Sequence, residues 1–181
     1  MTAGRLIAVV GPSGVGKDSV MSGLAAALPG LRRVRRVITR DPTLGGEAFE
    51  PVTEAEFARR RDAGAFCLHW RAHGLRYGIP ADVRAATEAG TDCLVNLSRG
   101  ALAEAYAAFP RLFVLNITAR PETLAHRLAG RGREAEAEIA RRLSRRGAAL
   151  PPGLDVVTIA NDGPLDDTIR AALRALQPVS P

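Results

Sequence analysis

Short apolar runs of strand length alternate along this chain with longer stretches in which apolar residues recur every three or four positions. The short runs are typical of buried strands, and the longer stretches are typical of helices with one buried face. The predicted strands are 6–10, 34–38, 66–70, 75–77, 93–97, 112–117 and 156–160. The predicted helices are 18–28, 53–63, 81–89, 101–109, 121–129, 134–149 and 165–176.

Several predicted helices have recognisable ends. Pro29 and Gly30 end the first helix, because both residues are poor helix formers. The segment 53–56 is a capping box that opens the second helix, and Pro80 stands at the start of the third. Strands that alternate with helices predict an α/β fold, with a mostly parallel sheet flanked by helices on both faces.

Length and composition indicate one globular domain. The chain has 181 residues, and its hydrophobic fraction of 46% argues against disorder. It has no apolar run near the roughly 18 residues that a membrane helix needs, and no signal-peptide pattern. We therefore expect a cytoplasmic protein. Cys67 and Cys93 lack metal-ligand spacing, and we expect them to be reduced, buried thiols.

The basic residues are almost all arginine. Lys17 is the only lysine among 25 Lys and Arg residues, and the formal net charge is +6. A composition that uses arginine wherever either cation serves indicates that arginine does not serve at position 17. A lysine acts on phosphates as a compact point charge, which a planar guanidinium cannot imitate.

A glycine-rich segment joins the first predicted strand to the first predicted helix. It fits the phosphate-loop (P-loop) pattern G-x-x-x-x-G-K with Gly11, Pro12, Ser13, Gly14, Val15, Gly16 and Lys17. Glycines let the backbone wrap around a phosphate, and the following helix directs its positive end toward it. The position between a strand and a helix favours a P-loop over an ordinary glycine-rich turn.

Asp18 occupies the position at which a P-loop has a Ser or Thr ligand to Mg²⁺, and Ser19 follows it. A carboxylate there could hold Mg²⁺ directly or through water. The alternative is an acid that the helix dipole favours in the first turn, with Ser19 supplying the hydroxyl. Asp18 and Ser19 are therefore both candidate metal ligands.

A second group of arginines surrounds Gly130 and Gly132 between two predicted helices, and it includes Arg127, Arg131 and Arg142. Arginines beside a glycine hinge can swing onto phosphates, and phosphoryl transfer needs such cations. The alternative is a solvated basic helix face with glutamate partners. A P-loop in the same chain favours the first interpretation.

The chain resembles the guanylate-kinase-like branch of nucleoside monophosphate kinases. The motifs that carry the resemblance occur in the order of that family and are GPSGVGK, ITR, HGLRYGIP, RLAGRGREAEAEIARRL and ANDG. The resemblance implies a single P-loop kinase domain that uses ATP and Mg²⁺. Its core would be 1–33, 81–125 and 146–178, with a substrate-binding insertion at 34–80 and a lid at 126–145.

The same resemblance implies roles for single residues. Arg127, Arg131 and Arg142 resemble the lid arginines that contact the transferred phosphate, which makes them catalytic candidates beside Lys17. Asn161, in the late ANDG motif, resembles the position beside the adenine of ATP.

The chain departs from guanylate kinases at the positions that recognise guanine. Those enzymes have a glutamate in an F-L-E stretch that accepts hydrogen bonds from the guanine edge, whereas this chain has FCLHW, with Leu68 followed by His69 and Trp70. Thr43 stands where they have a second arginine after the T-R pair. A site without the glutamate loses much of its selectivity for guanine, so guanine is not the expected acceptor.

Other motifs resemble a narrower family, the ribose 1,5-bisphosphate phosphokinases of phosphonate catabolism. They are GPSGVGKDS, RRVITR, GGE, TEAEF, WRAHGLRYGIP and VNLSRG. This resemblance implies ATP-dependent phosphorylation of ribose 1,5-bisphosphate to 5-phospho-α-D-ribose 1-diphosphate plus ADP. The alternatives are a guanylate or other nucleoside monophosphate kinase, and a non-catalytic guanylate-kinase-like interaction module.

A small sugar with two phosphates must be recognised by cations and hydrogen bonds. Arg36 and Arg40 are four residues apart, a spacing that puts them on one face of a strand. Residues 96–99 follow a strand at the end where α/β sheets bind ligands. The candidate substrate ligands are Arg36, Arg40, Glu47, His73, Tyr77, Asn96, Ser98 and Arg99.

The expected partner is thus a small phosphorylated sugar, without nucleic acid or membrane, and a homodimer remains open. Aromatic residues make up only 4% of the chain, which argues against nucleic-acid binding. Trp70 and Tyr77 either line the sugar pocket or pack within their strands. No catalytic base is expected, because a phosphate acceptor is already ionised near neutral pH.

Overall fold

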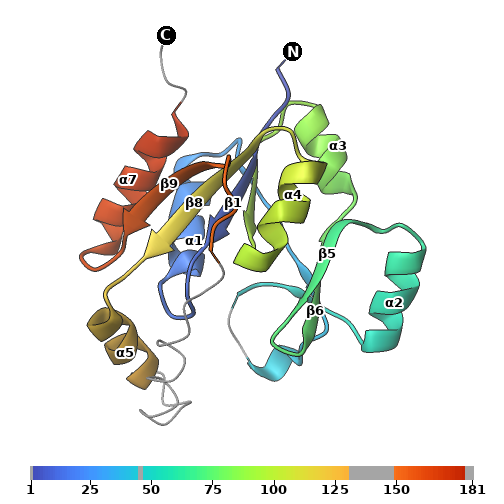
Figure 1. Cartoon of the computed structure of the whole chain (residues 1–181), viewed down its shortest axis with the longest axis horizontal. Helices are drawn as coiled ribbons and strands as arrows, with labels where there is room; N and C mark the ends of the chain where they lie inside the picture. The colour runs from blue at the N-terminus through green and yellow to red at the C-terminus, as the bar shows by residue number, and fades with distance from the viewer. Residues whose placement is uncertain (1, 45–46, 131–148, 178–181) are drawn as a thin grey trace.

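The computed structural model describes residues 2–44, 47–130 and 149–177. In these residues, a five-stranded parallel sheet has helices on both faces, and a smaller sheet lies to one side (Figure 1). The strands of the parallel sheet, in spatial order, are β2 (Arg32–Arg33), β7 (Cys93–Asn96), β1 (Leu6–Val10), β8 (Leu112–Thr118) and β9 (Asp155–Ala160). The α/β prediction is therefore confirmed.

Strand β1 is buried on both faces, which explains its uninterrupted apolar sequence. Ile7 and Val9 face α1 (Lys17–Ala27) and α7 (Leu165–Leu176), while their neighbours along the strand face α3 (Asp82–Glu88) and α4 (Leu102–Ala108). Each fully buried side chain of this size contributes about 1.5–3 kcal/mol through removal from water. Because the strands are parallel, their carboxyl ends meet at one edge of the sheet.

The smaller sheet contains residues of the predicted insertion. In spatial order its strands are β4 (Glu50–Pro51), β3 (Val37–Ile38), β6 (Leu75–Pro80) and β5 (Phe66–Ala72). Helix α2 (Glu54–Asp62) packs against β5, with the Phe57 and Phe66 rings stacked at a centroid distance of 4.7 Å.

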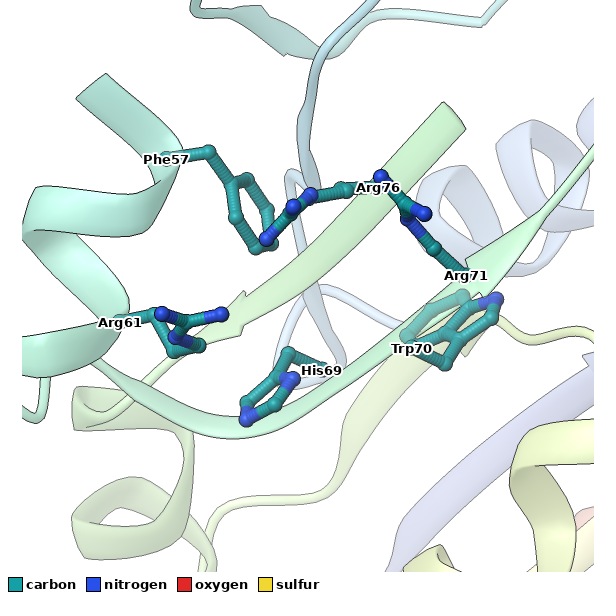
Figure 2. A pocket seen from close by; sticks show the side chains of 6 residues that line it. All are labelled: Phe57, Arg61, His69, Trp70, Arg71 and Arg76. Atoms are coloured by element: carbon teal, nitrogen blue, oxygen red, sulfur yellow. The ribbon is translucent and has the colours of Figure 1, made fainter. Parts of the chain in front are cut away.

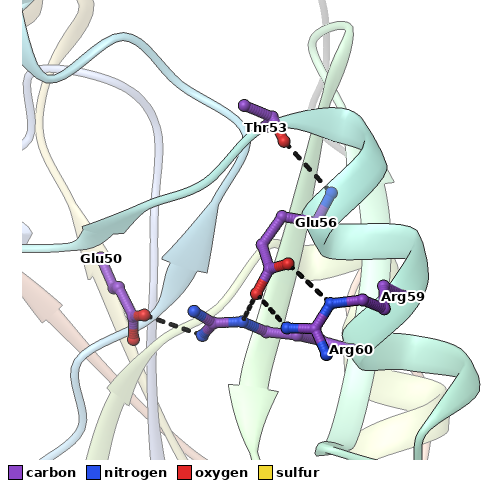
Figure 3. Close-up of polar contacts among 5 residues, drawn as sticks. All are labelled: Glu50, Thr53, Glu56, Arg59 and Arg60. Atoms are coloured by element: carbon purple, nitrogen blue, oxygen red, sulfur yellow. Dashed lines mark hydrogen bonds and ion pairs between the residues drawn. The ribbon is translucent and has the colours of Figure 1, made fainter.

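Helix α2 begins with the predicted cap. The Thr53 hydroxyl accepts a hydrogen bond from the Glu56 amide at 3.1 Å (Figure 3). The Glu56 carboxylate turns to Arg59 and Arg60, whose hydrogen bonds lower its pKa to about 2, and Arg60 also pairs with Glu50 on β4. The helix is thereby connected to the small sheet by charge as well as by packing.

A register shift between Phe66 and Leu68 turns these two side chains to opposite faces of β5. Leu68 packs into the core of the molecule, and Trp70 packs against that same core. We call this side of the small sheet its inner face, with Tyr77 and Ile79 of β6 as the register partners of Trp70 and Leu68. The outer face carries Phe66 and the residues that alternate with Trp70.

The structure corrects two predictions from the sequence. Of the predicted strand 34–38, only residues 37–38 form a strand, β3, which pairs with β4 and β6 in the small sheet, whereas the preceding β2 pairs with β7 in the large one. Pro80 is the last residue of β6 and not the start of a helix, and α3 begins two residues later. Helix α5 (Pro121–Ala129) and helix α7 have the predicted bounds.

Among the described residues, the remaining elements are two 3-10 turns, Pro42–Leu44 and Arg99–Ala101. The predicted helix 134–149 lies outside the described residues except for its final residue. None of the helices in the described ranges has the length and apolar character that crossing a membrane requires.

Candidate active site

The P-loop lies between β1 and α1, at the carboxyl edge of the large sheet. Gly16 has a φ of 94°, and a Cβ atom there would lie 2.7 Å from the Asn161 Nδ2 atom. A Cβ atom on Gly11 would lie 2.4 Å from the Ile117 carbonyl oxygen. The glycines are thus needed both for the turn and for the close approach of neighbouring backbone.

Lys17 lies across this loop. Its Nζ atom donates hydrogen bonds to the carbonyl oxygens of Gly11 at 2.8 Å and of Pro12 at 3.2 Å. The first residue of α1 therefore directs its charge back over the glycine-rich backbone. A cation in this position can reach the phosphates that the loop is shaped to hold.

Two side chains from other elements brace the loop at Val15. Asn161, which follows β9, donates from Nδ2 to the Val15 carbonyl oxygen at 2.8 Å, and its Oδ1 atom accepts from the Thr168 hydroxyl at 2.8 Å. Arg127 of α5 donates to the Val15 carbonyl oxygen at 3.2 Å and to the backbone carbonyl oxygen of Asn161 at 2.8 Å. The sequence missed this bracing role of Asn161 and the contribution of Thr168.

Asp18 is paired with a residue from a different strand. Its Oδ1 atom accepts from the Arg33 guanidinium, which also donates to the Ser22 hydroxyl at 2.8 Å. Ser19 is exposed on α1. Of the two candidate metal ligands, Asp18 is therefore the one with a fixed orientation.

Near the carboxyl end of β7, Arg36 is buried, with only 6% of its surface exposed, and is paired with Glu47. Burial lowers the pKa of its guanidinium to about 10, so the group stays charged near neutral pH. The Asn96 amide donates to the Glu47 carboxylate at 3.4 Å. The end of β7 and Glu47 therefore meet around one buried cation.

Trp70 forms a second connection between the small sheet and the end of β7. Its indole Nε1 donates to the Ser98 hydroxyl at 2.9 Å, and its ring stacks on Tyr77 at a centroid distance of 5.2 Å and an interplanar angle of 7°. The Arg36 guanidinium carbon lies 4.9 Å from the Tyr77 centroid and 6.0 Å from that of Trp70. The sequence did not decide whether Trp70 lines the sugar pocket or packs within its strand. Its position beside Ser98 and Tyr77 follows from the register of β5 and β6.

Two other candidate arginines have distinct positions. Arg99 donates to the Asn116 Oδ1 atom at 3.0 Å, at the ends of β7 and β8. The guanidinium of Arg40 lies 5.7 Å from the centre of the Phe49 ring. The Nε atoms of both Arg36 and Arg99 are buried without a hydrogen-bond partner in the described part of the chain.

His73 is separated from these groups. It forms the turn between β5 and β6 with Gly74, has a φ of 52° and is exposed. In the described ranges, no hydrogen bond or ion pair connects it to the other candidate residues. The structure therefore does not bring this predicted substrate ligand together with the rest.

A separate hollow of about 360 Å³ lies beside α2 and the β5–β6 hairpin (Figure 2). Its lining consists of Phe57, Arg61, His69, Trp70, Arg71 and Arg76. Because residues 69 and 71 alternate with Trp70, they belong to the outer face and not to the side where Trp70 meets Ser98.

Metal-binding residues are sparse. In the parts of the chain that the structure describes, no group of three or more His, Cys, Asp or Glu side chains could hold a metal ion. A Mg²⁺ ion with one or two protein ligands and several water or phosphate oxygens fits the single oriented carboxylate of Asp18. The predicted catalytic residues Arg131 and Arg142 lie outside the described residues.

Comparison with known proteins gives close relatives along nearly the whole chain. A protein named ribose 1,5-bisphosphate phosphokinase PhnN from Ruegeria sp. is 57% identical over 175 residues, which cover 96% of this chain and 92% of that protein. Its namesake in Agrobacterium fabrum is 47% identical, with 95% of this chain and 96% of that protein covered. This chain belongs to the ribose 1,5-bisphosphate phosphokinase family.

The family also occurs as part of a longer protein, and its fold extends to other kinases. A bifunctional ribose 1,5-bisphosphokinase-thymidine phosphorylase of Cupriavidus necator is 45% identical over 96% of this chain, which corresponds to 29% of that protein. Guanylate kinase from Anaplasma phagocytophilum matches with a TM-score of 0.72 at 18% identity, covering 96% of this chain and 84% of that one. No family model matches. The relatives confirm the predicted family and phosphotransferase class.

Proposed function

We propose that this chain transfers the γ-phosphoryl group of ATP to the 1-phosphate of ribose 1,5-bisphosphate. The products are ADP and 5-phospho-α-D-ribose 1-diphosphate. The names of the relatives support the acceptor, and membership of a kinase family supports the use of ATP. The partner is then a small phosphorylated sugar. We propose the cytoplasm as the location of the protein.

Unpaired buried donors are the structural observation that supports a phosphate-rich acceptor best. Arg36 and Arg99 each keep a buried Nε atom without an acceptor in the described residues, beside the carboxyl end of β7. Buried guanidinium donors without an acceptor are costly, and phosphate oxygens would satisfy them with the correct geometry. The FCLHW stretch, which corresponds to the F-L-E stretch of guanylate kinases, has no glutamate. Its Leu68 is apolar and buried in the core.

The transfer itself needs little covalent chemistry from the protein. An oxygen of the acceptor phosphate attacks the γ-phosphorus, the bond to the β–γ bridging oxygen breaks, and ADP leaves with the electron pair. The attacking oxygen carries no proton near neutral pH, so no base is required. The protein contributes position and positive charge, from Lys17 on the donor side and from Arg36 and Arg99 on the acceptor side.

On the donor side, residues 11–17 would hold the ATP phosphates through their backbone amides and Lys17. Asp18 would hold Mg²⁺, directly or through water. The ion, when bound, supplies positive charge that neutralises the phosphates. Arg127 is tied to the loop, and Arg131 and Arg142 are proposed to reach the transferred group.

The proposed division of the chain follows these roles. The core is 1–33, 81–125 and 146–178, the insertion 34–80 carries acceptor ligands, and the lid is 126–145. The remaining proposed acceptor ligands are Arg40, Glu47, Tyr77, Asn96 and Ser98. Of these, Glu47 acts by holding Arg36, because its carboxylate would repel a phosphate.

A phosphotransfer assay tests the proposal. The protein is given ATP and Mg²⁺ with ribose 1,5-bisphosphate, GMP or AMP, and the products are separated by ion-exchange chromatography. We expect 5-phosphoribosyl 1-diphosphate as the main product, with little transfer to either nucleotide. Efficient phosphorylation of GMP, or no transfer to the sugar despite ATP binding, would contradict it.

A further inference from the structure

We propose that Trp70 determines acceptor specificity, because its indole fills the space beside the acceptor phosphates that a nucleobase would need. This inference rests on the proposed function, since it explains why a P-loop kinase of this fold takes a sugar without a base. Trp70 is the only tryptophan in the chain. It lies on the inner face of β5, two residues after Leu68.

The Tyr77 ring would otherwise be a platform for a base. Aromatic side chains in nucleotide sites stack on bases because every base has a flat π-face. Here the indole of Trp70 already stacks on Tyr77, nearly parallel at 7°. A purine could stack on Tyr77 at this position only by displacing the indole.

The indole is also held from its other end. Its Nε1 atom donates to the Ser98 hydroxyl, so the ring extends from the insertion to the loop that follows β7. Displacement by a base would break that hydrogen bond and would remove the ring from the hydrophobic core against which it packs. Stacking, the hydrogen bond and packing therefore act together to keep the ring in place.

A sugar bisphosphate does not need the filled space. It has no flat ring, and its negative charge can be met by the guanidinium of Arg36, whose carbon lies 6.0 Å from the indole centroid. Trp70 therefore leaves Arg36 in place for a phosphate while it blocks a base. It is a specificity-determining residue and takes no part in bond making.

The single tryptophan allows a direct test by fluorescence. The donor site is filled with a non-hydrolysable ATP analogue, and ribose 1,5-bisphosphate or GMP is titrated into the wild-type protein. We expect the sugar bisphosphate to change the tryptophan emission saturably and GMP to leave it unchanged. Saturable quenching by GMP at comparable concentrations would overturn the proposal.

Substitutions separate the space that the indole occupies from the hydrogen bond that it donates to Ser98. Ser98→Ala keeps the ring but removes its hydrogen bond, and we expect a shift of the emission maximum and lower fluorescence anisotropy. An unchanged spectrum and anisotropy would show that Ser98 does not hold the indole. Arg71→Ala, on the exposed outer face next to Trp70, is the matched control and should reproduce the wild-type spectrum.

Trp70→Ala is expected to bind GMP at least tenfold more tightly than wild type by calorimetry, with the ATP analogue present. Trp70→Phe retains a stacked ring and is expected to exclude GMP as the wild type does. A folded Trp70→Ala protein that binds the ATP analogue but shows no gain for GMP would overturn the proposal. Lack of sugar turnover by the wild type would instead contradict the proposed function, because the GMP comparison does not depend on turnover.

Discussion

Asp18, the first acidic residue of the P-loop helix, is ion-paired with Arg33 from the edge strand of the large sheet. Arg33 also donates to the Ser22 hydroxyl one turn further along the helix. One carboxylate oxygen of Asp18 is therefore engaged by a cation before any metal binds. The pair is partly exposed, with 46% of the Asp18 side chain accessible.

Arg33→Gln is expected to lower the Mg²⁺ concentration for half-maximal activity about fivefold, because an exposed ion pair of this kind contributes about 1 kcal/mol. The variant no longer offers a cation that competes with the metal for Asp18. Binding of Mn²⁺ in the presence of ADP, followed by electron paramagnetic resonance, provides a measurement independent of turnover. Arg32→Gln, whose partner is Asp82 on the surface, is the matched control. Equal Mn²⁺ affinity in wild type and Arg33→Gln would place Asp18 away from the metal.

Lys17→Arg is expected to reduce kcat/KM at least about 100-fold although the charge is kept. The wider guanidinium cannot occupy the space over the loop in which Nζ contacts the oxygens of Gly11 and Pro12. Steady-state kinetics measure the loss, and an unchanged thermal midpoint shows that folding is intact. An active Lys17→Arg enzyme would refute the special role of the single lysine.

Asn161→Ala is expected to destabilise the protein by about 2 kcal/mol, because the buried Thr168 hydroxyl loses its acceptor and the Val15 oxygen loses a donor. We also expect a higher KM for ATP, since the braced loop is the proposed phosphate site. Denaturant unfolding and kinetics measure the two effects. Thr168→Val removes only the distal hydrogen bond, so it should destabilise the protein without changing the KM for ATP; a rise in that KM would contradict the bracing argument.

Glu47→Gln is expected to cost about 3 kcal/mol in stability, because it leaves the buried Arg36 charge without its carboxylate partner. Urea unfolding measures this cost. Phosphate or the sugar bisphosphate should restore part of the loss by supplying negative charge to Arg36. The exposed Glu122→Gln change is a control, and equal stability of the two variants would mean that the pair does not stabilise the insertion.

The charge network of α2 predicts a pH dependence. Hydrogen bonds from Arg59 and Arg60 lower the pKa of Glu56 from 4.5 to about 2, so the stabilisation by the charged form is complete above pH 4.5 and is lost as the pH falls through about 2. The difference in thermal midpoint between wild type and Glu56→Gln should shrink over that range when followed by circular dichroism. A difference that is constant from pH 6 to 2 would contradict the pKa shift.

Thr53→Ala is the companion to that experiment. Removal of the cap hydroxyl should cost about 1 kcal/mol at every pH, because a hydroxyl does not titrate. Urea unfolding at pH 7 and pH 3 measures the cost. A loss that depends strongly on pH would mean that the cap and the Glu56 network are coupled.

Local order along the chain determined much of the fold. An unbroken apolar run predicted β1 and a glycine-rich segment predicted the loop after it, because these signals depend only on neighbouring residues. The lone lysine marked the proposed donor site through the composition of the whole chain. The bounds of α5 and α7 agree with the helical stretches predicted from the periodic apolar residues.

Contacts between distant segments were decided only by the tertiary structure. The break between β2 and β3 depends on which sheet each part joins, and the pairing of Arg33 with Asp18 follows from it. Trp70 reaches Ser98 because a register shift turns Leu68 and Trp70 inward, and the residues are 28 positions apart. The sequence determined the P-loop because its residues are contiguous, whereas the proposed acceptor site is assembled from strands whose register no local pattern encodes.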